Sequence, residues 1–166
     1  MLDTAKPAAA SAVEMTEIVL PSHANALGTV FGGQVAAWID IAAGVAAMRH
    51  ARNIAVTASM DDLHFMAPVH VGEIVILKAH VNRAFGTSME VGVRIEAENP
   101  LTGQRRHTAT AYLTFVALDA DGQRVPVPPL TPESEAEQRR YQQAEQRRIW
   151  RLERRRLRDE EGGRER

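Results

Sequence analysis

The sequence predicts an α+β fold in which one five-stranded antiparallel sheet curls around a single central helix. The helix is predicted over residues 33–50, where alanine is frequent, proline is absent and apolar residues surround the helix instead of forming a stripe. One strand-like run precedes it and four follow it, at residues 13–20, 54–65, 73–83, 88–98 and 104–118. A curled sheet is the simplest architecture that would bury such a helix completely.

The connections between the later strand-like runs carry turn residues. The segments MAPVHVG, AFGT and NPLTG each contain glycine or proline. The last two are short enough to be β-hairpins, so the strands that they join are expected to be antiparallel. A sheet of this kind has two open edges, and pairing one edge with a second copy would remove it. We therefore expect a homodimer.

The composition of the 166-residue chain indicates one folded domain with a further segment at each end. Residues 1–12 are predicted to be disordered, 13–125 to form the folded domain, and 126–166 to form a Pro-rich linker and an Arg/Glu-rich helical tail. Nine arginines and only two glutamates lie within 139–158. The tail is either a solvated or frayed helix, or an arm that contacts anionic partners such as nucleic acid or lipid.

Several classes of chemistry are excluded by missing residues. The chain has no cysteine, which excludes disulfides, thiolate nucleophiles and Cys-ligated zinc. Its six histidines lack HxxxH or HExxH spacing, and neither a GxSxG elbow nor a phosphate-binding GxxxxGK[ST] loop is present. Neither a metal nor a cofactor is expected. The N-terminus has no secretion signal and the longest apolar stretch is too short to span a bilayer, so a cytoplasmic location is expected.

Asp40 is the most informative residue of the predicted helix. It is the only ionisable group between Gly28 and Met48. A buried carboxylate without partners would cost several kcal/mol, so it is expected either to have hydrogen-bond partners or a catalytic task. The structural alternative is a carboxylate that reaches solvent at a dimer interface or is bound to a backbone amide.

The loop before the helix favours the catalytic alternative. Gly32 and Gly33 lie where the helix begins, so their amide groups lack intrahelical acceptors and can approach an oxyanion. Asp40 lies seven residues further on, about 10 Å along the axis, which is too far for both to act on one carbonyl. A second copy could bring its own loop, with the carboxamide of Asn25, to Asp40. An amide-lined oxyanion site, a carboxylate and a carboxamide suit hydrolysis of an activated carbonyl.

The same loop and helix resemble the acyl-CoA hydrolase family of hotdog-fold thioesterases. The matching residues include Asn25, VFGG at 30–33 and WID at 38–40, followed by VTASMDDLHFMAPVHVGE at 56–73, GTSMEVGV at 86–93 and PVPPLTPESEAE at 126–137. The resemblance covers about residues 13–148. Beyond Trp150 the chain has no family counterpart, and Phe31 stands where some members have histidine.

The resemblance implies a hotdog fold and a role for each matching residue. Asp40 would be the catalytic carboxylate, Asn25 its partner from the other subunit, Thr57 a helper hydroxyl, and the Gly33 amide a polariser of the thioester carbonyl. It also implies a trimer of dimers that binds coenzyme A at the subunit boundary. We further expect substrate contacts at Gly32 and phosphate contacts at Arg49, Arg83, Thr87 and Ser88, although arginines at strand ends are often only solvated.

The predicted function is hydrolysis of acyl-CoA to free fatty acid and coenzyme A. Whether Asp40 acts as general base or as nucleophile is left open, as is the acyl chain length. One alternative is a non-hydrolytic acyl-CoA binding or sensing module, which would gain little from a buried base. The other is an enoyl-CoA hydratase, which would need an Asp and His pair that does not adjoin this helix.

Overall fold

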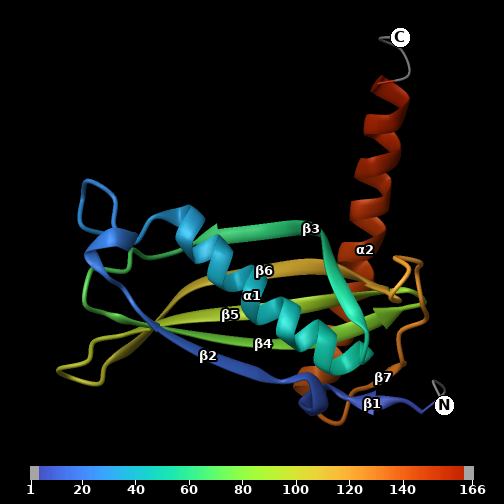
Figure 1. The fold of residues 1–166 in the computed structure, drawn as a ribbon, viewed down its shortest axis with the longest axis horizontal. Coiled ribbons are helices and arrows are strands. Elements are labelled where there is room, and N and C mark those ends of the chain that lie inside the picture. The colour runs from blue at the N-terminus through green and yellow to red at the C-terminus, as the bar shows by residue number, and fades with distance from the viewer. Residues whose placement is uncertain (1–3, 163–166) are drawn as a thin grey trace.

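The computed structural model describes residues 4–162 and contains one five-stranded antiparallel sheet (Figure 1). The strand order is β2-β4-β5-β6-β3. The strands are β2 (Val13–Ile18), β3 (Ile54–Phe65), β4 (Ile74–Phe85), β5 (Ser88–Glu98) and β6 (Arg105–Leu118). Strands β4, β5 and β6 are joined by tight turns, and β2 and β3 form the two edges. The predicted fold class is confirmed.

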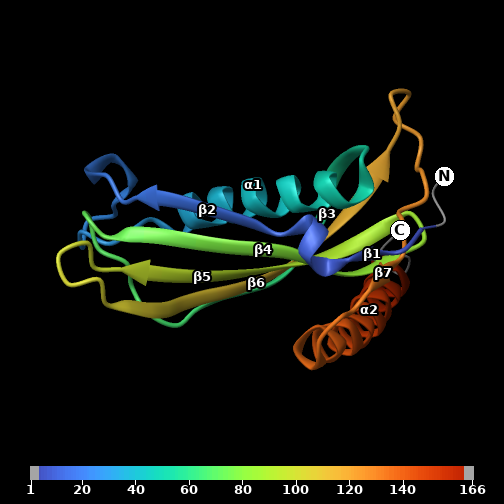
Figure 2. The same ribbon diagram turned by 90° about the horizontal axis from the view of Figure 1, so that it is seen from below.

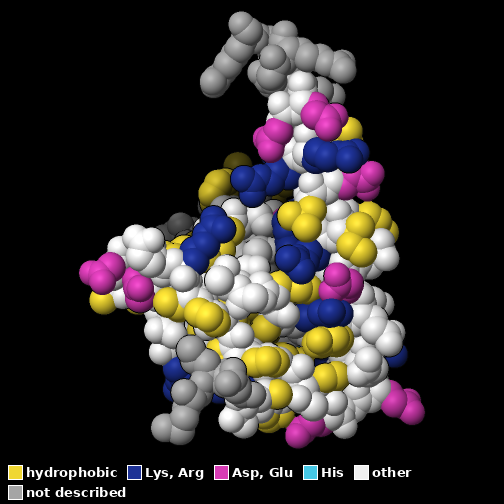
Figure 3. Space-filling view, turned by 90° about the vertical axis from the view of Figure 1, so that its right-hand side faces the viewer, with side chains coloured by type: hydrophobic (Ala, Val, Ile, Leu, Met, Phe, Trp, Pro, Cys, Tyr) yellow, Lys and Arg dark blue, Asp and Glu magenta, His cyan; other side chains and the backbone are white. Residues whose placement is uncertain are grey.

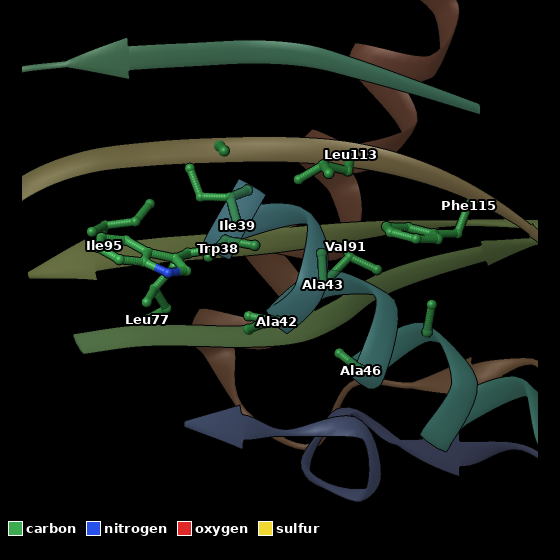
Figure 4. Close-up of a cluster of buried hydrophobic side chains, with 14 of the residues drawn as sticks. Trp38, Ile39, Ala42, Ala43, Ala46, Leu77, Val91, Ile95, Leu113 and Phe115 are labelled. Atoms are coloured by element: carbon green, nitrogen blue, oxygen red, sulfur yellow. The ribbon is translucent and has the colours of Figure 1, made fainter. Parts of the chain in front are cut away.

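The helix α1 (Gly32–Ala51) lies along one face of this sheet. Figure 4 shows its small residues pointing toward the strands, where they meet larger side chains of β4, β5 and β6. The buried residues of this contact include Ile39, Ala42, Ala43, Ala46, Leu77, Val91, Leu113 and Phe115. Because alanine adds little bulk, the helix axis can approach the sheet closely, and the large side chains of the strands fill the remaining space.

The expectation that the sheet buries this helix completely is wrong for a single chain. Ile41 is 55% exposed and Met48 is 44% exposed, both on the side of α1 that faces away from the sheet. Ile54 and Val56 on the edge strand β3 are also exposed. One curled sheet covers only part of the circumference of a helix, so an all-round apolar helix keeps an open apolar side.

The prediction of disorder over residues 1–12 is wrong for residues 6–11. Strand β1 (Lys6–Pro7) pairs in parallel with β7 (Leu130–Thr131), and the 3-10 helix η1 (Ala8–Ser11) follows it. The buried Ser11 hydroxyl donates to the Ala8 carbonyl at 2.7 Å and accepts from the Val81 amide at 2.9 Å. These bonds join the segment to β4. Residues 1–3 lie outside the described residues.

The C-terminal helix α2 (Glu135–Gly162) lies on the opposite side of the sheet from α1, as Figure 2 shows. Arg147 forms two hydrogen bonds with the buried carboxylate of Glu90 on β5, at 3.0 and 2.7 Å. Arg151 donates to Asp61 on β3 at 2.7 Å. This part of the tail is therefore docked on the sheet and is neither fully solvated nor frayed. Beyond it, α2 projects past β3 (Figure 1).

Candidate active site

The carboxylate of Asp40 lies in the third turn of α1 and is held by the edge strand β3. The Thr57 hydroxyl donates to Asp40 Oδ1 at 2.6 Å. Pairing between β3 and β6 shifts by one residue after Thr57, so that Ala58 has no partner residue across the strands. Within residues 4–162, no group donates a hydrogen bond to Asp40 Oδ2. One carboxylate oxygen is thus fixed, and the other is available to a substrate or a water molecule.

The predicted partner Asn25 organises the loop before α1. Its Oδ1 accepts from the Leu27 amide at 2.9 Å, and its Nδ2 donates to Thr29 Oγ1 at 2.9 Å. Gly28 has a φ of +74°, a conformation that glycine adopts without strain. A carboxamide carries two N–H donors, so Asn25 keeps one for a further acceptor. Among the described hydrogen bonds, none joins Asn25 to Asp40 of the same chain.

The first two amides of α1 are free, as the sequence predicted from the helix start. Among the described residues, neither Gly32 nor Gly33 donates its backbone N–H to another group, and the cap residue Phe31 supplies no side-chain acceptor. A Cβ atom on Gly33 would lie 2.6 Å from the Phe31 ring, so a larger residue would require this exposed ring to move.

An apolar cavity of about 390 Å³ opens beside these amides. Its lining includes Gly32 and Val35 of α1, Phe65 of β3, the loop that follows β3, and Ala109 of β6. The Phe65 ring lies 3.7 Å from the position that a Cβ on Gly32 would occupy. Cavities for small molecules commonly have volumes of about 300–1,000 Å³. The size and lining suit an acyl chain.

The predicted phosphate contacts have different surroundings in the structure. Arg83 forms an ion pair with Glu145 at 2.7 Å and lies 4.1 Å from the centre of the Tyr141 ring. Arg49 donates to the Ala12 carbonyl. Both guanidinium groups thus hold parts of the chain together.

Thr87 and Ser88, the other two predicted contacts, lie at the turn between β4 and β5. They border a groove that α2 forms with the sheet. Arginines of α2 line the same groove, an arrangement that was not predictable from the sequence. No cluster of three or more His, Cys, Asp or Glu side chains suited to a metal ion occurs in the part of the chain that the structure describes. Within residues 4–162, no helix is both long enough and apolar enough to cross a membrane.

Comparison with known proteins relates the whole domain to thioesterases. The thioesterase superfamily profile matches residues 27–104. The uncharacterized acyl-CoA thioester hydrolase YkhA of Bacillus subtilis is 43% identical over 127 residues, which make up 76% of this chain and 74% of that protein. Mouse acyl-coenzyme A thioesterase 11 is 43% identical over 138 residues, which make up 82% of this chain. The matched part spans only 23% of the length of the mouse protein.

Solved structures agree with this relationship. A hexameric acyl-CoA thioesterase is 42% identical, with a TM-score of 0.88, and the match covers 90% of this chain and 96% of that chain. An acyl-CoA hydrolase from Staphylococcus aureus, solved with butyryl coenzyme A and coenzyme A, is 36% identical with a TM-score of 0.88, and the match covers 96% of each chain. Alanine variants of that enzyme have been solved for an asparagine, for an aspartate 15 residues later and for a threonine 17 residues after the aspartate. The chain belongs to the acyl-CoA hydrolase family of hotdog-fold thioesterases.

Proposed function

We propose that this protein hydrolyses acyl-CoA thioesters to a free fatty acid and coenzyme A, with Asp40 as the reacting carboxylate. The observation that carries the proposal is the hydrogen bond between Thr57 and Asp40, which holds a half-buried carboxylate between α1 and the edge strand β3. The spacing of Asn25, Asp40 and Thr57 supports it. Intervals of 15 and 17 residues separate them, as they separate the residues replaced in the S. aureus variants.

The reaction needs a base, an oxyanion site and a leaving thiolate. Acting as general base, Asp40 would take a proton through its free Oδ2 from a water molecule that attacks the thioester carbonyl. Acting as nucleophile, it would form a mixed anhydride that water then hydrolyses. In both routes the carbonyl oxygen becomes an oxyanion, the C–S bond breaks, and coenzyme A leaves as a thiolate that is then protonated.

The oxyanion donor is proposed to come from a partner subunit. The Gly33 amide lies about 10 Å along the axis from Asp40 of the same helix, so one chain does not bring both to one carbonyl. A partner's loop would present Gly33 and the remaining N–H of Asn25 together. Exposed apolar residues on both elements that hold the carboxylate, Ile41 on α1 and Val56 on the edge strand β3, suit contact with that partner. We therefore propose a homodimer, and a trimer of dimers by analogy with the hexameric relative.

The acyl chain is proposed to enter the cavity beside Gly32. Gly32, which precedes the Gly33 amide, lines this cavity, so a thioester whose carbonyl binds at that amide would direct its apolar part into an apolar space. The burial of each methylene group stabilises the complex by about 0.8 kcal/mol. The binding of longer chains would therefore strengthen until the cavity is full.

The test is thiol release from a series of acyl-CoA substrates by the wild-type protein and matched variants. Asp40→Asn should lower kcat by about 10²–10⁴-fold because the variant has neither base nor nucleophile. Thr57→Val should lower kcat by about tenfold, since a charge-assisted hydrogen bond is lost. Asp62→Asn is the matched control, because Asp62 is a carboxylate on β3, the strand that carries Thr57, and it pairs with His64.

Calorimetric titration with coenzyme A separates catalysis from binding. The Asp40→Asn variant should retain the wild-type affinity for coenzyme A. Wild-type turnover by this variant would show that another group is the base. Binding without turnover by the wild-type protein would favour the non-hydrolytic binding or sensing module.

A further inference from the structure

The arginines that hold α2 to the sheet belong to a row that continues beyond the sheet. Arg147 and Arg151 bind carboxylates of β5 and of the edge strand β3, each at 2.7 Å, and both arginine side chains are largely buried. Arg154 and Arg158 follow at intervals of three and four residues, which places them on the same side of the helix. Only the first two arginines of this row lie over strands of their own chain.

The second half of the row lies in the part of α2 that projects past β3, residues 152–162, here called the overhang. Figure 1 shows α2 crossing the strands and passing β3, and Figure 3 shows hydrophobic, basic and acidic side chains exposed along the projecting helix. Residues 152–160 are all exposed. Among the described residues, neither Arg154 nor Arg158 forms an ion pair. Leu157 lies next to Arg154 on the helix surface, lines the same hollow beside β3, and is 47% exposed.

The length of the overhang matches the width of several strands. After Arg151 the helix continues to Gly162, a length of about 16 Å at about 1.5 Å per residue. Neighbouring strands of a sheet lie about 4.8 Å apart. The edge strand β3 is the strand along which the dimer proposed above would form. A second copy placed there would bring about three of its strands to the level of the overhang.

We propose that the overhang lies on the outer sheet face of a second copy, the face opposite α1, with Arg154, Leu157 and Arg158 as its contacts. The inference rests on the homodimer of the proposed function and adds a contact to it. In a two-fold dimer each copy would cover the other, so every contact would form twice. The outer face suits arginine, since hydroxyl and carboxylate groups such as Ser59 and Asp61 face α2 there.

The pattern of side chains on the overhang favours a second copy over an anionic lipid surface. A helix that lies in such a surface has one continuous apolar side with basic residues on the polar side. Leu152 and Leu157 are five residues apart and therefore about 140° apart around the helix. The exposed Glu153 and Glu160 lie between these two positions, on the side away from the row of arginines. The overhang thus has no continuous apolar side, whereas its arginines are aligned as those over its own sheet are.

The absence of cysteine from the chain permits a direct test. Leu157→Cys and Leu152→Cys would each introduce a single thiol, at positions where leucine is 47% and 51% exposed in one subunit. Leu152 is the matched control, because it lies on another side of the helix, in a hollow with Arg156 and Glu160. In the assembled protein, the thiol at position 157 should react with a maleimide several times more slowly than the thiol at position 152. In urea the two rates should become equal.

Charge reversal tests the arginines of the row. Sedimentation velocity over a dilution series would give the dissociation constant of the dimer. Arg158→Glu should raise this constant by about 100-fold, since the contact forms twice and each charge-assisted hydrogen bond contributes about tenfold. Arg156→Glu is the matched control, because it makes the same change of charge two residues away and Arg156 pairs with Glu160 of its own helix. It should change the dissociation constant by no more than about twofold.

Two outcomes would overturn the inference while leaving the dimer intact. Equal thiol reaction rates at positions 157 and 152 in the dimer would mean that solvent surrounds the overhang. Protection of position 157 only after addition of phosphatidylglycerol vesicles or of a single-stranded RNA would assign the surface to that ligand. Failure of the proposed function is distinguishable: a wild-type protein that sediments as a monomer would refute the proposed dimer together with this contact, and turnover by Asp40→Asn would refute the catalytic assignment alone.

Discussion

The buried ion pair between Arg147 and Glu90 gives a prediction about stability. Glu90 is fully buried on β5, and its carboxylate is held by the two hydrogen bonds from Arg147 and one from Asn82 at 2.9 Å. Arg147 also lies 3.7 Å from the centre of the Tyr112 ring. Replacing Arg147 with methionine keeps much of the apolar contact and leaves the Glu90 carboxylate with Asn82 alone.

The expected loss follows from this uncompensated charge. Removing one partner of a buried ion pair destabilises a protein by about 3–5 kcal/mol. The Arg147 side chain is 16% exposed, so water can enter the space that it leaves, and the lower end of that range applies. For a chain of this size, about 3 kcal/mol corresponds to a decrease in Tm of about 6–12 °C.

The assay is urea unfolding at a fixed protomer concentration, because an oligomer gains apparent stability with concentration. Arg147→Met should lower the free energy of unfolding by about 3 kcal/mol. Adding Glu90→Gln to that variant should restore part of the loss, because the unpaired charge is removed while an acceptor for Asn82 remains. A loss under 1 kcal/mol, or a double variant less stable than Arg147→Met, would refute the idea that Glu90 is a buried charge compensated by Arg147.

Two further predictions concern pH and acyl chain length. Burial lowers the pKa of both His50 and His80 from the usual 6.5, and nearby Arg140 lowers that of His80 further. As the pH falls, the histidines of the unfolded chain therefore take up protons before those of the folded chain do. The free energy of unfolding should be highest above a pH of about 6.5 and should decrease below it. His80→Gln should weaken this pH dependence, measured by urea unfolding at pH values of about 7.5 and 5.5. Ala109→Leu should reduce the cavity volume and lower kcat/KM for long acyl-CoA substrates while leaving acetyl-CoA unchanged; equal effects on both would place the acyl chain elsewhere.

Most of the sheet and the long helix α1 were predictable because local signals agree with the fold. The strands β3 and β5 have the predicted bounds, and the other three begin or end within two residues of them. Glycines in positive-φ conformations lie in the turns between the strands, as at Gly86 and Gly103, and these turns are recognisable from composition. Turn chemistry and strand-like runs depend on neighbouring residues alone.

The N-terminal segment shows where local signals fail. Its alanines gave no strand or helix pattern, so disorder was expected, yet Ser11 donates and accepts hydrogen bonds in a buried position. Its partner Val81 lies 70 residues away. A residue whose structure depends on so distant a contact cannot be assigned from its neighbours.

Part of the candidate site was predictable, because it too depends on local sequence signals. Asp40 was conspicuous because it stands alone in an apolar helix, and the helix-start glycines were recognisable from their position. Thr57 was predicted as a site residue only from the family resemblance, since nothing in a strand sequence indicates which hydroxyl faces a helix. The apolar composition of α1 predicted burial, but composition does not distinguish burial by the same chain from burial by a partner.

The arginines of α2 have two roles, and their positions relative to the sheet explain the difference. Arg147 and Arg151 are four residues apart, so they share one side of the helix, and that side meets the carboxylates of Glu90 and Asp61. Arg148 is one residue beyond Arg147, and its guanidinium group lies 4.5 Å from the centre of the Phe85 ring. Further along, α2 projects past the sheet (Figure 1), and there Arg155 and Arg156 pair with Asp159 and Glu160 of the same helix. The same arginine-rich composition therefore produces ion pairs with strand carboxylates over the sheet and ion pairs within the helix beyond it.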